Sequence, residues 1–160
     1  MTDNQKQILK TDITVTKAAT VYNGQTLLQL WNNNDMEALA SFYNQIASPV
    51  IDLWRPDISA SELTSGIVGG EYVALTAVKQ NAFMMYLVAG SLNATSANIR
   101  TALDAIFGNT TTKTNLLVVA KKQATNFESL FKGAIQGAAY VSTTYGISVT
   151  GQDIYQAKIM

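Results

Sequence analysis

Residues 97–108 read Ala-Asn-Ile-Arg-Thr-Ala-Leu-Asp-Ala-Ile-Phe-Gly, and they predict an α-helix more plainly than any other part of the chain. Apolar side chains recur there at intervals of three and four residues, which places them on one face of a helix. Gly108 follows the last of them, at a position where glycine commonly ends a helix. The apolar positions are Ile99, Ala102, Leu103, Ile106 and Phe107.

Helical spacing extends in both directions from this stretch. It predicts a long helix over 112–132, closed by Gly133, and a buried helix over 71–90 that is central to the core. Shorter helices are predicted over 24–31, 36–48 and 61–67. The inward face of the 71–90 helix is predicted to consist of Leu75, Val78, Ala82, Met85, Tyr86 and Ala89.

The two ends of the chain have a different pattern. β-Branched residues alternate with threonines in Ile13-Thr-Val-Thr16, which indicates a short strand, an extended arm or a frayed terminus. Residues 138–149 are β-branched and aromatic without any charge, which indicates one long strand or a loose hairpin. Thr150 then caps a short helix over 151–158, with Ile154 facing inward.

We therefore predict a mainly α fold. It is a helical bundle with a short N-terminal extended arm (1–22), a helical body (23–133) and a C-terminal β-prone arm or hairpin (134–160) ending in a short helix. An uncharged β-prone segment near a terminus is an open sheet edge that a neighbouring molecule can pair with. The predicted interface residues are Tyr140, Val141, Tyr145, Ile147, Val149, Ile154 and Tyr155.

The composition argues against most catalytic and metal sites. The chain has no histidine and no cysteine, which are the side chains best suited to proton transfer near neutral pH, to nucleophilic attack and to zinc binding. Ser129 and Lys132 match a serine-x-x-lysine pattern, but its companion motifs are missing. We expect no catalytic, cofactor-binding or metal-binding residues, no cofactor and no enzymatic activity.

The charge balance favours association. Eleven basic and eleven acidic residues cancel, and only 14% of the chain is charged against the usual ~25%. Either the chain is a neutral cytosolic domain, or its surface is covered by copies of itself or by partners. The chain contains only two arginines, Arg55 and Arg100, so we expect no nucleic-acid footprint. The longest apolar stretch, 81–92, is too short to span a bilayer, and the polar start predicts no signal peptide.

An aromatic and charged corner lies between the two prolines of the chain. Residues 50–56 suit a strand or a short helical turn, and we favour a short helix or irregular segment that docks Trp54 in the core. Arg55 is placed to bridge Asp52 or Asp57, or to stack on an aromatic ring. We interpret Trp54, Arg55 and Asp57 as a structural corner, with a ligand pocket as the alternative.

Four motifs occur in a fixed order along residues 24–133. They are Leu39-Ala-Ser-Phe-Tyr-Asn44, Ala47-Ser-Pro49 leading to Leu53-Trp-Arg55, Ala97-Asn-Ile-Arg-Thr-Ala-Leu103, and Lys121-Lys-Gln-Ala-Thr-Asn-Phe-Glu-Ser-Leu-Phe131. Their order resembles a family of small virion proteins of tailed bacteriophages, of the head-to-tail connector type. After Phe131 the chain departs from the family pattern, because Lys132-Gly-Ala134 replaces a stretch rich in glycine and threonine.

The resemblance implies a head-to-tail adaptor. Such proteins are helical, form a dodecameric ring beneath the portal and link the capsid to the tail. The implied partners are further copies of the chain, the portal protein and another neck or tail protein, with DNA only as passing cargo and no membrane. The implied location is the neck of a virion assembled in the host cytoplasm. The alternatives are a tail terminator, a stopper, a capsid decoration protein or, in a different class, a small enzyme or ligand-binding protein.

Overall fold

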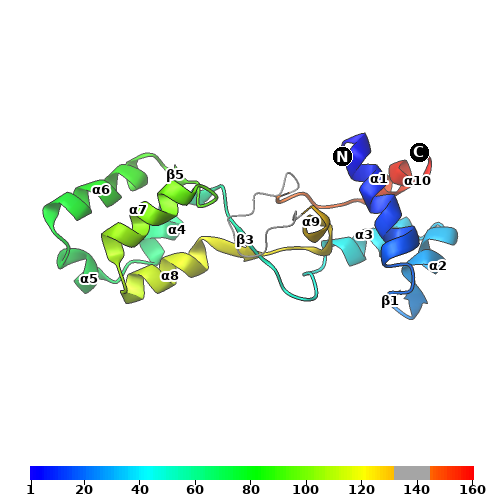
Figure 1. Cartoon of the computed structure of the whole chain (residues 1–160), viewed down its shortest axis with the longest axis horizontal. Coiled ribbons are helices and arrows are strands. Elements are labelled where there is room, and N and C mark those ends of the chain that lie inside the picture. Colours follow the sequence, from blue (N-terminus) through cyan, green and yellow to red (C-terminus); the bar gives the residue numbers. More distant parts are fainter. Residues whose placement is uncertain (132–144) are drawn as a thin grey trace. The chain divides into compact units, whose positions relative to one another are not determined.

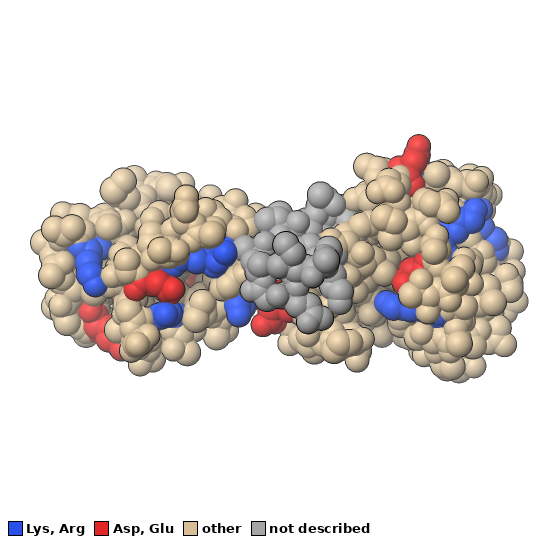
Figure 2. Space-filling view, in the orientation of Figure 1, with Lys and Arg blue, Asp and Glu red and all other residues tan. Residues whose placement is uncertain are grey.

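The computed structural model describes residues 1–131 and 145–160, and these residues are mainly α-helical, as predicted (Figure 1). Lys, Arg, Asp and Glu side chains are scattered over the visible faces (Figure 2). The chain forms two compact units, which do not follow the predicted boundaries after residues 22 and 133. The described part of unit 2 contains residues 52–122, and that of unit 1 contains residues 1–51, 123–131 and 145–160.

Unit 1 consists of short helices, most of which begin at a side-chain cap. Thr2, Thr26, Thr125 and Thr150 each form a capping box with the residue three positions later, and Asp35 accepts a hydrogen bond from the Ala38 N–H. The elements are α1 (Asp3–Thr11), a π-helical turn η1 (Asp12–Thr16), an antiparallel hairpin of β1 (Val21–Tyr22) and β2 (Gln25–Thr26), α2 (Leu27–Asn32), α3 (Met36–Asn44), α9 (Asn126–Leu130) and α10 (Gly151–Lys158).

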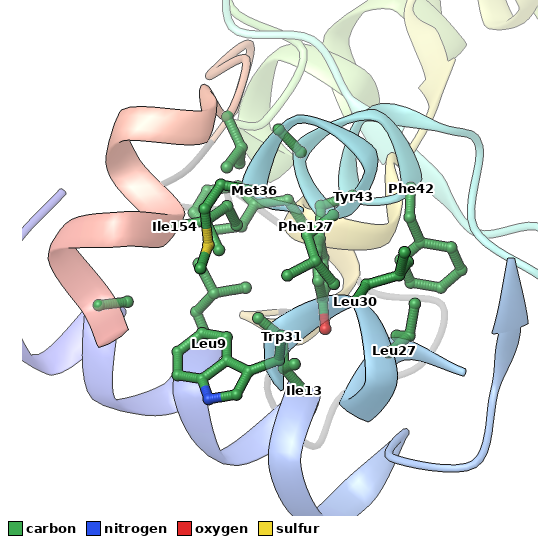
Figure 3. Packing of buried hydrophobic residues seen from close by; sticks show 14 residues of the cluster. Leu9, Ile13, Leu27, Leu30, Trp31, Met36, Phe42, Tyr43, Phe127 and Ile154 are labelled. Atoms are coloured by element: carbon green, nitrogen blue, oxygen red, sulfur yellow. The ribbon is translucent and has the colours of Figure 1, made fainter. Parts of the chain in front are cut away.

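The core of unit 1 combines side chains from segments far apart in the sequence (Figure 3). Leu9, Tyr43, Phe127 and Ile154 are each fully buried, and they come from α1, α3, α9 and α10. The Tyr43 hydroxyl donates to the buried Asp12 carboxylate at 2.7 Å. Burial raises the pKa of Tyr43, and the charge of Asp12 raises it further.

The predicted N-terminal extended arm is wrong. Residues 3–11 form α1, because the Thr2–Gln5 capping box satisfies the first free backbone groups of that helix. Leu9 and Ile13 are four residues apart, and both are fully buried in the core. The first segment of the chain is therefore part of the body of unit 1.

The final helix is present as predicted. Helix α10 covers Gly151–Lys158, Thr150 caps it, and it packs against α1 and α3. A Cβ at position 151 would meet the carboxylate of Glu37 in α3, so a larger residue there would displace that side chain. The predicted strand or hairpin over 138–149 falls mostly outside the described residues, and residues 145–149 form no strand.

Unit 2 has its own core. Phe83 and Phe107 meet edge to face at 5.0 Å within a cluster that also includes Ile58, Leu63 and Leu116. Strand β4 pairs with β5, and β3 pairs with β6. The elements are β3 (Asp52–Trp54), β4 (Ile58–Ser59), α4 (Ala60–Ser65), α5 (Gly69–Val73), α6 (Ala77–Val88), β5 (Ser91–Leu92), α7 (Ala97–Phe107), α8 (Thr111–Val119) and β6 (Lys121–Gln123), whose last residue belongs to unit 1.

Helix α7 confirms the prediction made for residues 97–108. It ends at Phe107, and Gly108 follows with a φ of 58°, a conformation that L side chains rarely adopt. Ile106 and Phe107 are buried, and Ile99 and Leu103 pack against the same cluster. The shorter predicted helices are present as α2, α3 and α4, with ends shifted by a few residues.

The predicted helix over 71–90 is two helices, and its predicted inward face is only partly correct: Leu75, Ala82 and Tyr86 pack against the core, whereas Val78, Met85 and Ala89 are exposed. Helices α5 and α6 are separated at residues 74–76. Phe83 is the buried residue of α6, whereas Val78 and Met85 are exposed. Because apolar residues occur on every side of this helix, their spacing did not distinguish the two faces.

The predicted helix over 112–132 is also interrupted. Helix α8 ends at Val119, and backbone bonds to a distant segment hold the following residues extended. Ala124 N–H donates to Ile51 O at 2.8 Å and Ala124 O accepts from Ala47 N–H at 2.9 Å. Residues 52–54 form a strand for the same reason, where a short helix or irregular segment had been favoured.

Truncating Ile154 is expected to destabilise unit 1 by about 2–5 kcal/mol, because Ile154→Ala leaves a cavity in the core. Tyr155→Ala is the matched control: that side chain is 45% exposed, so we expect a change within about 0.5 kcal/mol. Urea unfolding followed by Trp31 fluorescence in a Trp54→Phe background reports on unit 1 alone. Equal effects of the two substitutions would show that α10 does not belong to this core.

Candidate interaction surface

Helix α6 exposes large apolar side chains on one face. Its other face carries Phe83, which packs against Phe107 and Tyr72. Val78, Met85 and Val88 are 78%, 74% and 82% exposed, and Met84 is 45% exposed. We call Val78, Met84, Met85 and Val88 the apolar face of α6. In Figure 2 the upper edge of unit 2, where Figure 1 places α6, shows no charged atoms.

The spacing along this face suits a partner helix. Val78, Asn81, Met85 and Val88 follow one another at intervals of three, four and three residues, the pattern of a helix–helix seam. Lys79, which carries the one charge within α6, directs its Nζ inward to Ile106 O at 3.1 Å. Clustered exposed apolar residues mark protein–protein contact sites more often than inert surface.

Glu71 fixes the α5–α6 corner to α8. Its carboxylate accepts hydrogen bonds from Thr112 N–H at 2.7 Å and from Thr111 N–H at 3.0 Å, at the start of α8. The bonds from Thr112 and Thr111 hold the pKa of Glu71 down at about 2. The Gln80 side chain donates to Tyr72 O at 3.1 Å, which joins α6 to α5. Hydrogen bonds therefore join α6 to α5 and α5 to α8, and they hold the apolar face of α6 in place.

The predicted corner at Trp54, Arg55 and Asp57 is a charged network. Arg55 Nε lies 3.6 Å from Asp57 Oδ1, as predicted, and Arg55 Nη1 lies 2.6 Å from Glu62 Oε1. The hydrogen bond from Arg55 holds the pKa of Glu62 down at about 2, with further bonds from Ser59. Glu62 was not among the predicted partners of Arg55. The signal was the Ser59-x-x-Glu62 capping box, which orients this carboxylate in the first turn of α4.

Trp54 is half-buried and pairs with two other cations. Arg100 Cζ and Lys121 Nζ each lie 4.9 Å from its ring centroid, within the range of cation–π attraction. A cavity of about 290 Å³ opens beside the ring, between α7 and α8. Its lining combines an apolar wall with a charged rim: Ala94, Leu103, Phe107, Leu116, Leu117 and Ala120, together with Arg100, Asp104 and Lys113.

The residues predicted as an interface are dispersed. Val149 and Ile154 are 2% and 0% exposed in the core of unit 1, so their predicted role in binding a neighbour is wrong. Ile147 and Tyr155 are exposed, and Tyr145 is half-buried. Tyr140 and Val141 lie outside the described residues. The largest group of exposed apolar side chains on one described helix is on α6, which had been predicted to be buried.

Within residues 1–131 and 145–160, no cluster of three or more acidic residues is arranged to hold a metal ion. No helix in these ranges is long and apolar enough to cross a membrane.

Comparison with known proteins identifies no relative of this chain. No protein-family model matches it, and no curated protein or solved structure is similar to it.

The Glu71 carboxylate is expected to stabilise unit 2 at pH values above 4.5, the ordinary pKa of its carboxyl group. This contribution is lost as the pH falls toward about 2, where the carboxylate of the folded protein takes up a proton. Glu71→Gln should lower the unfolding temperature of unit 2 at neutral pH, and the difference from wild type should shrink near pH 2. Thermal unfolding followed by Trp54 fluorescence in a Trp31→Phe background measures this. A difference that is equal at both pH values would contradict the assignment.

Proposed function

We propose that the protein is a structural virion component, a head-to-tail adaptor of a tailed bacteriophage, which acts through protein–protein contacts and carries out no catalysis. The apolar face of α6 is the observation that carries this proposal, because four large apolar side chains meet water on a braced helix. The order of motifs along residues 24–133 supports the phage class.

The chemistry of the described residues supports contact over catalysis. The chain lacks histidine and cysteine. Glu62 and Glu71, the two glutamates with a strongly lowered pKa, remain ionised near neutral pH because they accept structural hydrogen bonds. Neither carboxylate is therefore suited to carry a proton in a reaction at that pH.

The proposed assembly is a ring, dodecameric in the family that the chain resembles. Its partners are further copies of the chain, the portal protein and another neck or tail protein. Because the chain has only two arginines and no net charge, DNA would pass such a ring as cargo without being gripped. The contact surface we propose is on unit 2, in place of the C-terminal segment.

Native mass spectrometry and class averages from electron microscopy test this proposal. The wild-type protein is expected to form closed rings. Met85→Asp is expected to raise the dissociation constant of each contact at least about tenfold, since a carboxylate would lose its hydration inside an apolar contact.

Val21→Asp is the matched control, because Val21 is 64% exposed but lies on β1 of unit 1. This variant is expected to assemble like wild type. A wild-type protein that remains a compact monomer at the highest concentration at which it stays in solution, and also in the presence of the portal, would refute the proposed function.

A further inference from the structure

The cavity between α7 and α8 suits apolar side chains from another molecule. It measures about 290 Å³, and Leu103, Phe107 and Leu116 form part of its wall. A cavity of about 150 Å³ accommodates benzene, so this one has room for side chains of the size of methionine and valine. Leu117 is 38% exposed at its rim, and the next residue, Val118, is 74% exposed. The apolar lining thus continues onto the outer surface of α8.

Unit 2 therefore carries two separate apolar surfaces, one protruding and one recessed. The described residues that line the cavity belong to α7, α8, the loops beside them and Trp54 of β3, and none belongs to α6. A ring built from identical copies needs a heterologous contact, in which each copy offers two different surfaces. Both kinds of surface are present on this one unit.

The charged side chains beside both surfaces already have hydrogen-bond or ion-pair partners. Lys79 of α6 donates inward to Ile106 O, which leaves the apolar face of α6 uncharged. At the cavity, Lys113 Nζ lies 3.0 Å from Asp104 Oδ1, and Arg100 Nη1 donates to the carbonyls of Ala94 and Thr95 at 2.7 and 2.9 Å. Expelling water from such a contact with an uncharged apolar face leaves each of these ions with the partner it already has.

We propose that the apolar face of α6 of one copy inserts into the α7–α8 cavity of the next copy. The inference rests on the proposed function, because it names the contact that closes the ring. Met85 and Val88 enter the cavity, and Leu117 and Val118 cover them from the rim. Asn81 lies within the seam, where a single polar residue sets the register of paired helices.

Two variants, each damaged on one surface, test this contact. Met85→Asp disables the protruding face, and Leu117→Asp disables the cavity rim without removing a fully buried side chain. Each variant alone is expected to lose ring assembly, with a dissociation constant raised at least about tenfold. An equimolar mixture retains one intact face and one intact cavity, so it should form heterodimers and nothing larger. Native mass spectrometry with one variant isotope-labelled identifies the heterodimer.

Thr114→Asp, at an exposed position of α8 outside the cavity lining, is the matched control and should assemble like wild type. Circular dichroism verifies that each variant is folded, and Val118→Asp replaces Leu117→Asp if the latter unfolds. Rings that persist in the rim variant, or a mixture without heterodimers, overturn this contact while leaving the proposed function standing. A monomeric wild type overturns both.

Discussion

Two hydrogen bonds between the Asn44 side chain and the Val149 backbone hold unit 1 together across 105 positions of sequence. Asn44 Nδ2 donates to Val149 O and Val149 N–H donates to Asn44 Oδ1, each at 2.8 Å, so the carboxamide pairs with the backbone as another peptide group would. This clamp sets α10 against α1 and α3, with Ile154 in the core. Asn126 plays a similar part between α9 and α3, since its Nδ2 donates to Phe42 O at 2.9 Å. Buried polar groups thereby obtain partners without a continuous sheet.

The two units of the chain differ in how their cores are assembled. Asn44 gives the backbone of Val149, the last residue of the predicted β-prone stretch, both of its partners within the same chain. The described part of unit 2, in contrast, is the single stretch 52–122, with a separate core around Phe83 and Phe107. Its helices α4, α6, α7 and α8 enclose that core by contacts among themselves, which leaves the outer side of α6 uncovered in the described residues. Among the described helices, α6 of unit 2 thus carries the largest group of exposed apolar side chains.

Local signals in the sequence were sufficient for part of the fold. Helix α7 combines a single apolar stripe with a terminal glycine, and α10 combines a threonine cap with Ile154, so both were predicted. Helix α1 was missed because its sequence, Asp3 to Thr11, is mostly polar, and its capping box was not recognised. The break after α8 arises from backbone bonds between Ala124 and residues 47 and 51, which no local pattern reveals. The corner at Arg55 was predicted through Asp57, but the stronger partner is Glu62, seven residues away.

Helix α6 shows why the candidate surface was placed inside the core. In Ala77-Val-Lys-Gln-Asn-Ala-Phe-Met-Met-Tyr-Leu-Val88 apolar residues occur on every side, so periodicity identifies a helix without identifying its buried face. Such a helix is predicted to be buried, because in an isolated chain large apolar side chains are more stable away from water. The structure buries Phe83 and leaves Val78, Met85 and Val88 exposed. A helix that is apolar all round is fully covered when a second molecule packs against its outer side. Such packing would explain why the sequence of α6 is typical of a buried helix although these three side chains are exposed in a single copy.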